Sequence, residues 1–104
     1  MIIVTTDEIP GQRAVKVLGA VQGSAVQTTH LGMHFLAALR QLAGGEVNAY
    51  SGLMEKARTE AVQRMTQSAE AMGANAVVGM RFASSTITAG VAEILVYGTA
   101  VVVE

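Results

Sequence analysis

The stretch YSGLMEKARTEAVQRMTQSAEAM, from Tyr50 to Met72, decides the fold of this chain. Its apolar residues recur every three or four positions, a spacing that predicts one amphipathic helix. They are Tyr50, Leu53, Met54, Ala57, Ala61, Met65, Ala69 and Met72. The small alanines allow this helix to lie close to a sheet, and Gly73 supplies the left-handed residue that ends it.

Strand patterns lie on both sides of the helix. They cover Met1–Glu8, Arg13–Thr28, Asn75–Ala83 and Val91–Val103. Gly19 and Gly23 inside the second strand predict a bulge or the close approach of another backbone. Leucines at helical spacing predict a short helix over Leu31–Leu42. The fold class is therefore α+β in the order β-β-α-α-β-β: a two-layer α/β sandwich with a mainly antiparallel sheet, one short helix and one long helix.

The last strand, Val91–Val103, is apolar on both faces. Ile94, Val96 and Ala100 lie on one face, and Leu95, Tyr97, Val101 and Val103 lie on the other. A single helix layer covers only one side of a sheet, so the other side needs a partner. The simplest partner is another copy of the chain.

Composition leads to the same expectation. The 104 residues predict a single domain over 1–104, and 51% of them are hydrophobic while only 14% are charged. An average domain carries about 25% charged residues, so we expect part of this surface to be buried between copies. Seven basic and eight acidic residues argue against nucleic-acid and anionic-membrane partners.

Other features bear on location. The chain has no cysteine, which fits a reducing cytoplasm, and its first residues lack the basic and long apolar regions of a signal peptide. Near the C-terminus the uncharged run Ile94–Val103 has ten residues, half of the roughly 20 of a membrane span. We therefore expect a soluble, cytoplasmic protein.

The segment from Ala38 to Gly79 carries a family resemblance. Its most specific part is Gly73-Ala74-Asn75-Ala76-Val77-Val78-Gly79, and Leu39-Arg40, Gly44-Gly45, Tyr50 and Ala57-Arg58 agree with it. With these residues the chain resembles the YbjQ-like family, bacterial and archaeal proteins of unknown function that are also called heavy-metal-binding domains. The likeness extends over nearly the whole chain.

The resemblance implies a dodecin-subunit-like fold, a homopentamer and no enzyme activity. The chain departs from the family at Glu46, where an arginine usually follows the paired glycines, and at Ser51, where an acidic residue often follows the tyrosine. If the family's arginine binds an anion or a neighbouring subunit, Glu46 does not reproduce that role.

His30 and His34 are the only histidines, and their i,i+4 spacing on a helix places both imidazoles on one face. Such a pair can hold a transition-metal ion if a third ligand comes from Asp7, Glu8 or a neighbouring subunit. The alternative is two partly exposed histidines near a helix start. The absence of cysteine removes the soft ligands that a heavy metal prefers.

Four further residues are candidate ligand or interface contacts: Arg40, Glu46, Tyr50 and Arg81. Arginine and tyrosine are enriched at interfaces, which favours a subunit contact or an ion pair with Glu46 or Glu93 over a ligand-binding role. No Ser-His-Asp trio is indicated, because the histidines share one short segment and Asp7 is the only aspartate.

These features predict a non-enzymatic, homo-oligomeric protein that binds a small ligand or a heavy metal, with the pentamer taken from the resemblance. The alternative is a dodecin-like storage protein that holds a cofactor or small molecule between its subunits. An enzyme with its active site between subunits is a third class and the least supported.

Overall fold

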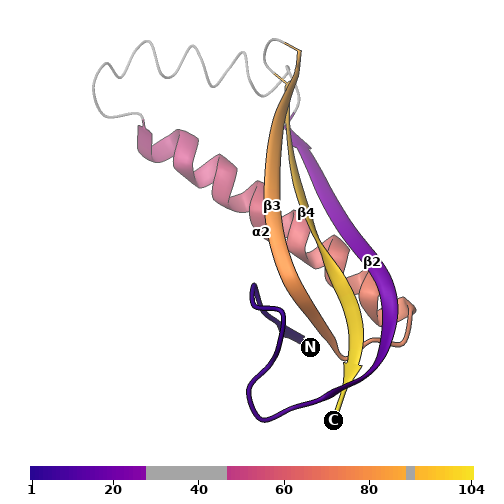
Figure 1. Ribbon diagram of the computed structural model, residues 1–104. Coiled ribbons are helices and arrows are strands. Elements are labelled where there is room, and N and C mark those ends of the chain that lie inside the picture. Colours follow the sequence, from indigo (N-terminus) through magenta and orange to yellow (C-terminus); the bar gives the residue numbers. More distant parts are fainter. Residues whose placement is uncertain (28–46, 89–90) are drawn as a thin grey trace.

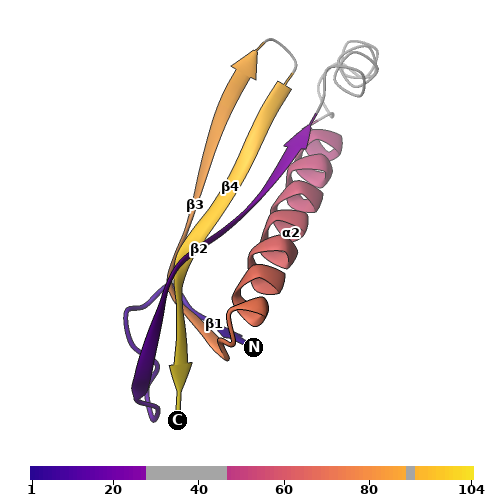
Figure 2. The same ribbon diagram turned by 90° about the vertical axis from the view of Figure 1, so that its right-hand side faces the viewer.

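The computed structural model describes residues 1–27, 47–88 and 91–104. In chain order its elements are β1 (Ile2–Ile3), β2 (Ala14–Gln27), α2 (Val47–Ala71), β3 (Ala76–Thr88) and β4 (Val91–Val103). They form two layers, a long curved sheet with α2 lying across one face (Figures 1 and 2). The α+β class is confirmed, while the short helix expected over Leu31–Leu42 lies outside the described residues.

Helix α2 confirms the element on which the fold prediction rests. Its predicted stripe is the buried side, because Ala57, Ala61, Met65 and Ala69 are all 0% exposed. Gly73 follows the last turn with a φ of 90°, the left-handed conformation expected of a helix-ending glycine. Met72, at the end of the stripe, lies at the margin of the core and is 40% exposed.

The sheet has the strand order β1-β3-β4-β2. The pairs β2–β4 and β3–β4 are antiparallel, but β1 pairs with β3 in parallel, Ile2 opposite Ala76. The sheet is therefore mixed, and the prediction of a mainly antiparallel sheet omitted this parallel pair. The alternation of apolar and polar residues along one strand does not indicate whether the neighbouring strand runs parallel or antiparallel to it, so the sequence could not predict this pair.

The first strand is also much shorter than predicted. The strand ends at Ile3, although Val4 and Thr6 still bond to β3. The Thr6 hydroxyl donates to the Glu8 carbonyl at 2.6 Å, and the Gln12 N–H donates to the Ile9 carbonyl at 3.0 Å. These local bonds satisfy the backbone as turns, which competes with strand pairing.

The sequence predicted a bulge or a close backbone approach at the two glycines of β2, and the structure has one of these at each. Gly19 has a φ of 133° and lies at a register shift between β2 and β4, so it forms the irregularity. At Gly23 a Cβ atom would collide with the carbonyl oxygen of Ala61 and the backbone nitrogen of Met65. Gly23 is thus where the helix backbone lies against the strand.

Each face of the sheet has its own core. Between α2 and the sheet, Val21, Ala25, Val77, Ile94 and Val96 pack against the helix. On the opposite side, which we call the outer face, a smaller cluster contains Ala76, Val101 and Val103, with Ile9 and Val78 packed against it.

The second apolar side of β4 is therefore partly covered by the chain's own N-terminal segment. This corrects the expectation that another copy must supply all of its cover. Farther along the same side of β4, Tyr97 remains 44% exposed.

Candidate functional site

The N-terminal segment from Val4 to Arg13 crosses the outer face and is bonded to the sheet at both ends. At its start the N–H of Val4 donates to the Val77 carbonyl and the N–H of Gly79 donates to the Thr6 carbonyl, both at 2.9 Å. At its end Arg13 and Glu104 exchange two backbone hydrogen bonds of 2.9 Å. The crossing segment is thus held in place by the sheet.

Three irregularities of the sheet lie beneath this segment. In β2 the register with β4 shifts between Ala14 and Lys16 and again between Val17 and Gly19. In β3 it shifts between Val78 and Arg81, where Gly79 has a φ of 65°. Bulges bend a strand away from its neighbour, and here they leave a hollow of about 500 Å³ between sheet and segment.

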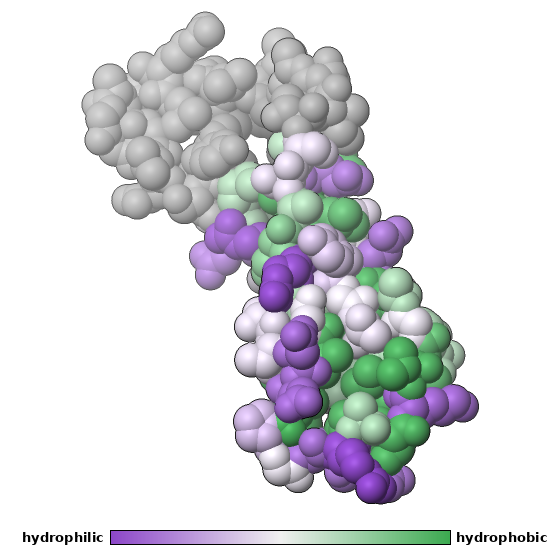
Figure 3. All heavy atoms as spheres, in the orientation of Figure 1, coloured by the Kyte–Doolittle hydropathy of each residue, from purple (hydrophilic) through white to green (hydrophobic). Residues whose placement is uncertain are grey.

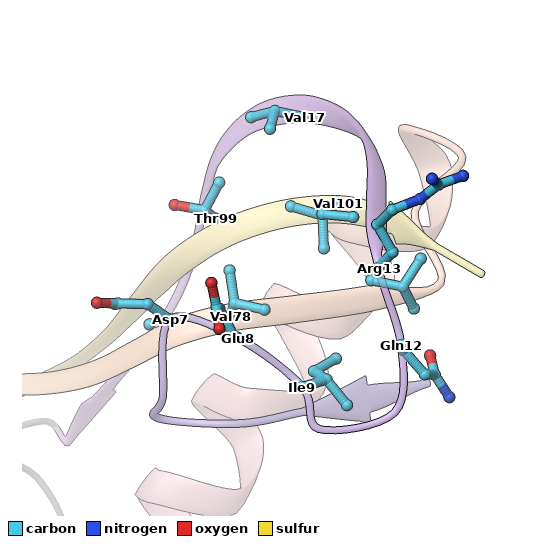
Figure 4. Close-up of a pocket in the computed structure, with 12 residues that line it drawn as sticks. Asp7, Glu8, Ile9, Gln12, Arg13, Val17, Val78, Thr99 and Val101 are labelled. Atoms are coloured by element: carbon cyan, nitrogen blue, oxygen red, sulfur yellow. The ribbon is translucent and has the colours of Figure 1, made fainter.

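The hollow has an apolar floor and a charged rim (Figure 4). Val78, Val101 and Val103 of the sheet form the floor, and Val17 lies beside Val101 on the neighbouring strand β2 with 68% of its surface exposed. The carboxylates of Asp7 and Glu8 lie on one side, and the Arg13 side chain lies on the other. Figure 3, which views the outer face, shows apolar and polar residues intermixed there.

The two carboxylates lack a cationic partner within the described part of the chain. The ion pair found there joins Arg64 and Glu60 on α2, 3.4 Å apart. Asp7 lies near Gly79, since a Cβ at that glycine would be 3.8 Å from its Oδ1. The arrangement can accept hydrogen bonds from a cation while an apolar body rests on the valines.

The predicted site residues fall in different parts of the chain. His30, His34, Arg40 and Glu46 lie outside the described residues, as does the side chain of Tyr50, whose backbone belongs to α2. Arg81 is exposed, and its Nη1 donates to the carbonyls of Thr5 and Met80 at 2.8 Å each. Arg81 therefore braces the segment that carries Asp7 and Glu8.

Asp7 and Glu8, named from the sequence only as a possible third metal ligand, line the hollow together. Sequence reasoning did not connect Ile9, Val17 and Val78 with any site. The available signals were Gly19 and Gly79, because a glycine within a strand often marks a bulge.

The described residues do not fit a heavy-metal centre. Across 1–27, 47–88 and 91–104, no three His, Cys, Asp or Glu side chains lie close enough to share an ion. The chain has no cysteine, and the adjacent carboxylates of Asp7 and Glu8 are hard ligands. No helix in the described part is long and apolar enough to cross a membrane.

Fold and hollow together define a small α+β protein with a surface hollow on the sheet face opposite its helix. The family model YbjQ_1, described as "Putative heavy-metal-binding", matches residues 1–104. The chain belongs to this family, whose function is unknown.

Relatives of similar length occur in both bacteria and archaea. Each is called a UPF0145 protein. The one from Thermotoga maritima is 50% identical over 104 residues, which cover 100% of this chain and 98% of the relative. The one from Halalkalibacterium halodurans is 54% identical with the same coverage. The one from Pyrococcus abyssi is 53% identical, covering 100% of this chain and 91% of the relative.

A crystal structure also shares the fold. It is a protein with unknown function of the DUF74 family from Pediococcus pentosaceus, with a TM-score of 0.68 and 15% sequence identity. The match covers 100% of this chain and 98% of the other. At this identity the likeness shows the fold alone.

Proposed function

We propose that this protein is a non-enzymatic homo-oligomer that binds a small ligand. The observation that supports assembly is that both edges of the sheet lack a strand neighbour in the described part of the chain. Strand β2 is the edge along all of its 14 residues, and β3 has β4 on one side only from Arg81 to Thr88. Long unpaired edges readily pair with another chain.

The dimensions of the subunit also favour assembly. Its Cα radius of gyration is 16.9 Å, whereas a compact domain of this length has one of about 13 Å. Its accessible surface is 6672 Å², against about 5,500 Å² for a folded monomer of this mass. Such an extended subunit buries less surface by itself than a compact domain does.

The two edges differ, which favours a ring over a two-fold dimer. When one surface of a subunit joins a different surface of the next, each added subunit leaves the same surface free. The contact therefore repeats until the last subunit meets the first and forms a ring. A joint between β2 of one copy and β3 of the next has this property. The number five comes from the family resemblance.

Native mass spectrometry of freshly purified protein tests the assembly. We expect one dominant species with the mass of five 10.8 kDa chains. Because the gentle conditions preserve non-covalent complexes, the same spectrum reports any retained ligand. A stable species of one chain at micromolar concentration would refute the assembly.

A dodecin-like storage role, with the ligand between subunits, is the alternative form of this function. Two exposed aromatic residues support it, because flat cofactors stack on such rings. Phe82 is 43% accessible on the helix side of the sheet, and Tyr97 is 44% accessible on the outer face. The purified protein would then absorb above 300 nm. A colourless protein whose native mass spectrum shows no bound ligand would exclude this form for the protein as isolated.

Metal binding by His30 and His34 is a second candidate, supported by their spacing and by the family's description. Calorimetry with zinc, nickel and copper would compare the wild type with the double variant His30→Ala/His34→Ala. We expect the wild type to bind at least one of these ions about tenfold more tightly, the loss usual when metal ligands are disturbed. Equal, weak binding by both proteins would sink the hypothesis.

A further inference from the structure

We propose that the hollow beneath the N-terminal segment binds a small organic cation with a short apolar body, such as an alkylamine. The proposal rests on the small-ligand part of the proposed function and gives it a place and a chemical class. It does not depend on the number of subunits, because all of the residues that form the hollow belong to one chain.

The first support is that the hollow is built before a ligand arrives. The crossing segment is bonded to β3 at Val4 and Thr6, to the Arg81 guanidinium at Thr5, and to the C-terminal residue at Arg13. Ile9 packs into the cluster of Val101 and Val103 behind it. Preformed sites bind more tightly because a ligand does not have to order the walls.

The second support is the exposed valine at the edge of the hollow. Val17 is 68% exposed on the edge strand β2, where it pairs with Val101 of β4 between two register shifts. A ligand lying on Val78 and Val101 would also contact Val17. Removing these apolar groups from water favours a ligand with a hydrocarbon portion.

The third support is the charge on the rim. Asp7 and Glu8 are adjacent and lack a cationic partner in the described part of the chain, so their oxygens can accept hydrogen bonds from an ammonium group. The Arg13 side chain extends on the far side of the hollow (Figure 4). The carboxylates therefore favour a positive charge on the part of the ligand that lies next to the apolar floor.

Methyl NMR of the full chain, labelled at valine and kept in its native assembly, tests the proposal. Three probes share a six-carbon chain and differ in charge: hexylamine, hexan-1-ol and hexanoate, each titrated at pH 7. We expect hexylamine to shift the methyl signals of Val17, Val78 and Val101, and to bind about tenfold more tightly than hexan-1-ol. Hexanoate should bind most weakly.

The double variant Asp7→Asn/Glu8→Gln should lose the preference for hexylamine over hexan-1-ol. Both side chains are exposed, so the change should leave the fold intact, which circular dichroism checks. The matched control is Glu70→Gln, which removes one exposed carboxylate from α2 on the other side of the sheet and should keep the full preference.

Equal binding of hexylamine and hexan-1-ol by the wild type would overturn the proposal, as would strongest binding of hexanoate or shifts confined to other valines. Native masses of the same samples separate this result from the proposed assembly. An assembled protein without amine binding refutes the site alone. A monomer that binds hexylamine at these valines refutes the assembly alone.

Discussion

At Gly23 the missing side chain sets how closely the helix approaches the sheet. A Cβ there would overlap the backbone of Ala61 and Met65, which cannot rotate aside as a side chain could. Around this contact the helix presents alanines and Met65, all fully buried. The Arg64 guanidinium then donates to the Ser24 carbonyl at 2.5 Å, joining the helix to the next residue of the strand.

We predict that Gly23→Ala lowers the free energy of unfolding by about 1–3 kcal/mol, the usual cost of overpacking a core. Urea denaturation at a fixed protein concentration would measure it. The control is Gly52→Ala, because nothing lies within 4 Å of a Cβ at this helical glycine. It should stabilise the protein by about 0.5–1 kcal/mol, as alanine favours helix over glycine. Equal effects of the two changes would contradict the role of Gly23.

The residues of the site were only partly predictable from the sequence. The pair Asp7 and Glu8 stands out as acidic, and Pro10-Gly11 predicts the turn that follows, but neither indicates that the segment lies on the outer face. That path depends on contacts between residues far apart in the chain, Thr5 with Arg81 and Arg13 with Glu104. The spacing of apolar residues along the chain does not indicate which distant residues will be in contact.

Among the elements, the two edges of the sheet have the clearest consequence. Val26 lies on β2 with 45% of its surface exposed, and Phe82 lies with 43% exposed on the part of β3 that has β4 on one side only. Lysine on an edge strand is a device by which proteins prevent edge-to-edge pairing, because its charge resists burial in a joined sheet.

We therefore predict that Val26→Lys or Phe82→Lys shifts the assembly toward single chains, as measured by light scattering after size exclusion. Gln63→Lys is the control: it places the same charge on the exposed side of α2 and should leave the mass unchanged. If both edge variants retain the wild-type mass, the subunits join through another surface.

The elements themselves were predicted unequally well. The range Val91–Val103 agrees fully with β4, and α2 begins three residues earlier than the predicted Tyr50. Both have long runs of consistent pattern, flanked by glycine. Strand β1 was overestimated because Thr5 and Thr6 favour strands by type. In the structure the Thr6 hydroxyl donates to the Glu8 carbonyl in a turn, and the Thr5 carbonyl accepts from the Arg81 side chain.

At the scale of the whole molecule, the subunit is a rod of 54 × 23 × 16 Å with a helix along one face and a bonded segment crossing the other. The segment covers the apolar cluster around Val101 and Val103, and the rest of the outer face and both edges remain open in the described chain. With only 14% charged residues, the chain has few charged groups with which to solvate so large a surface.

The position of β4 has a consequence for how the protein is made. This strand pairs with both β2 and β3, and it consists of 13 of the last 14 residues of the chain. Synthesis proceeds from the N-terminus at roughly 5–20 residues per second, so β2 is finished several seconds before its partner exists. Until β4 has been synthesised, β2 lacks the strand that it joins in the folded sheet. The nascent protein must therefore keep β2 from pairing elsewhere during this interval.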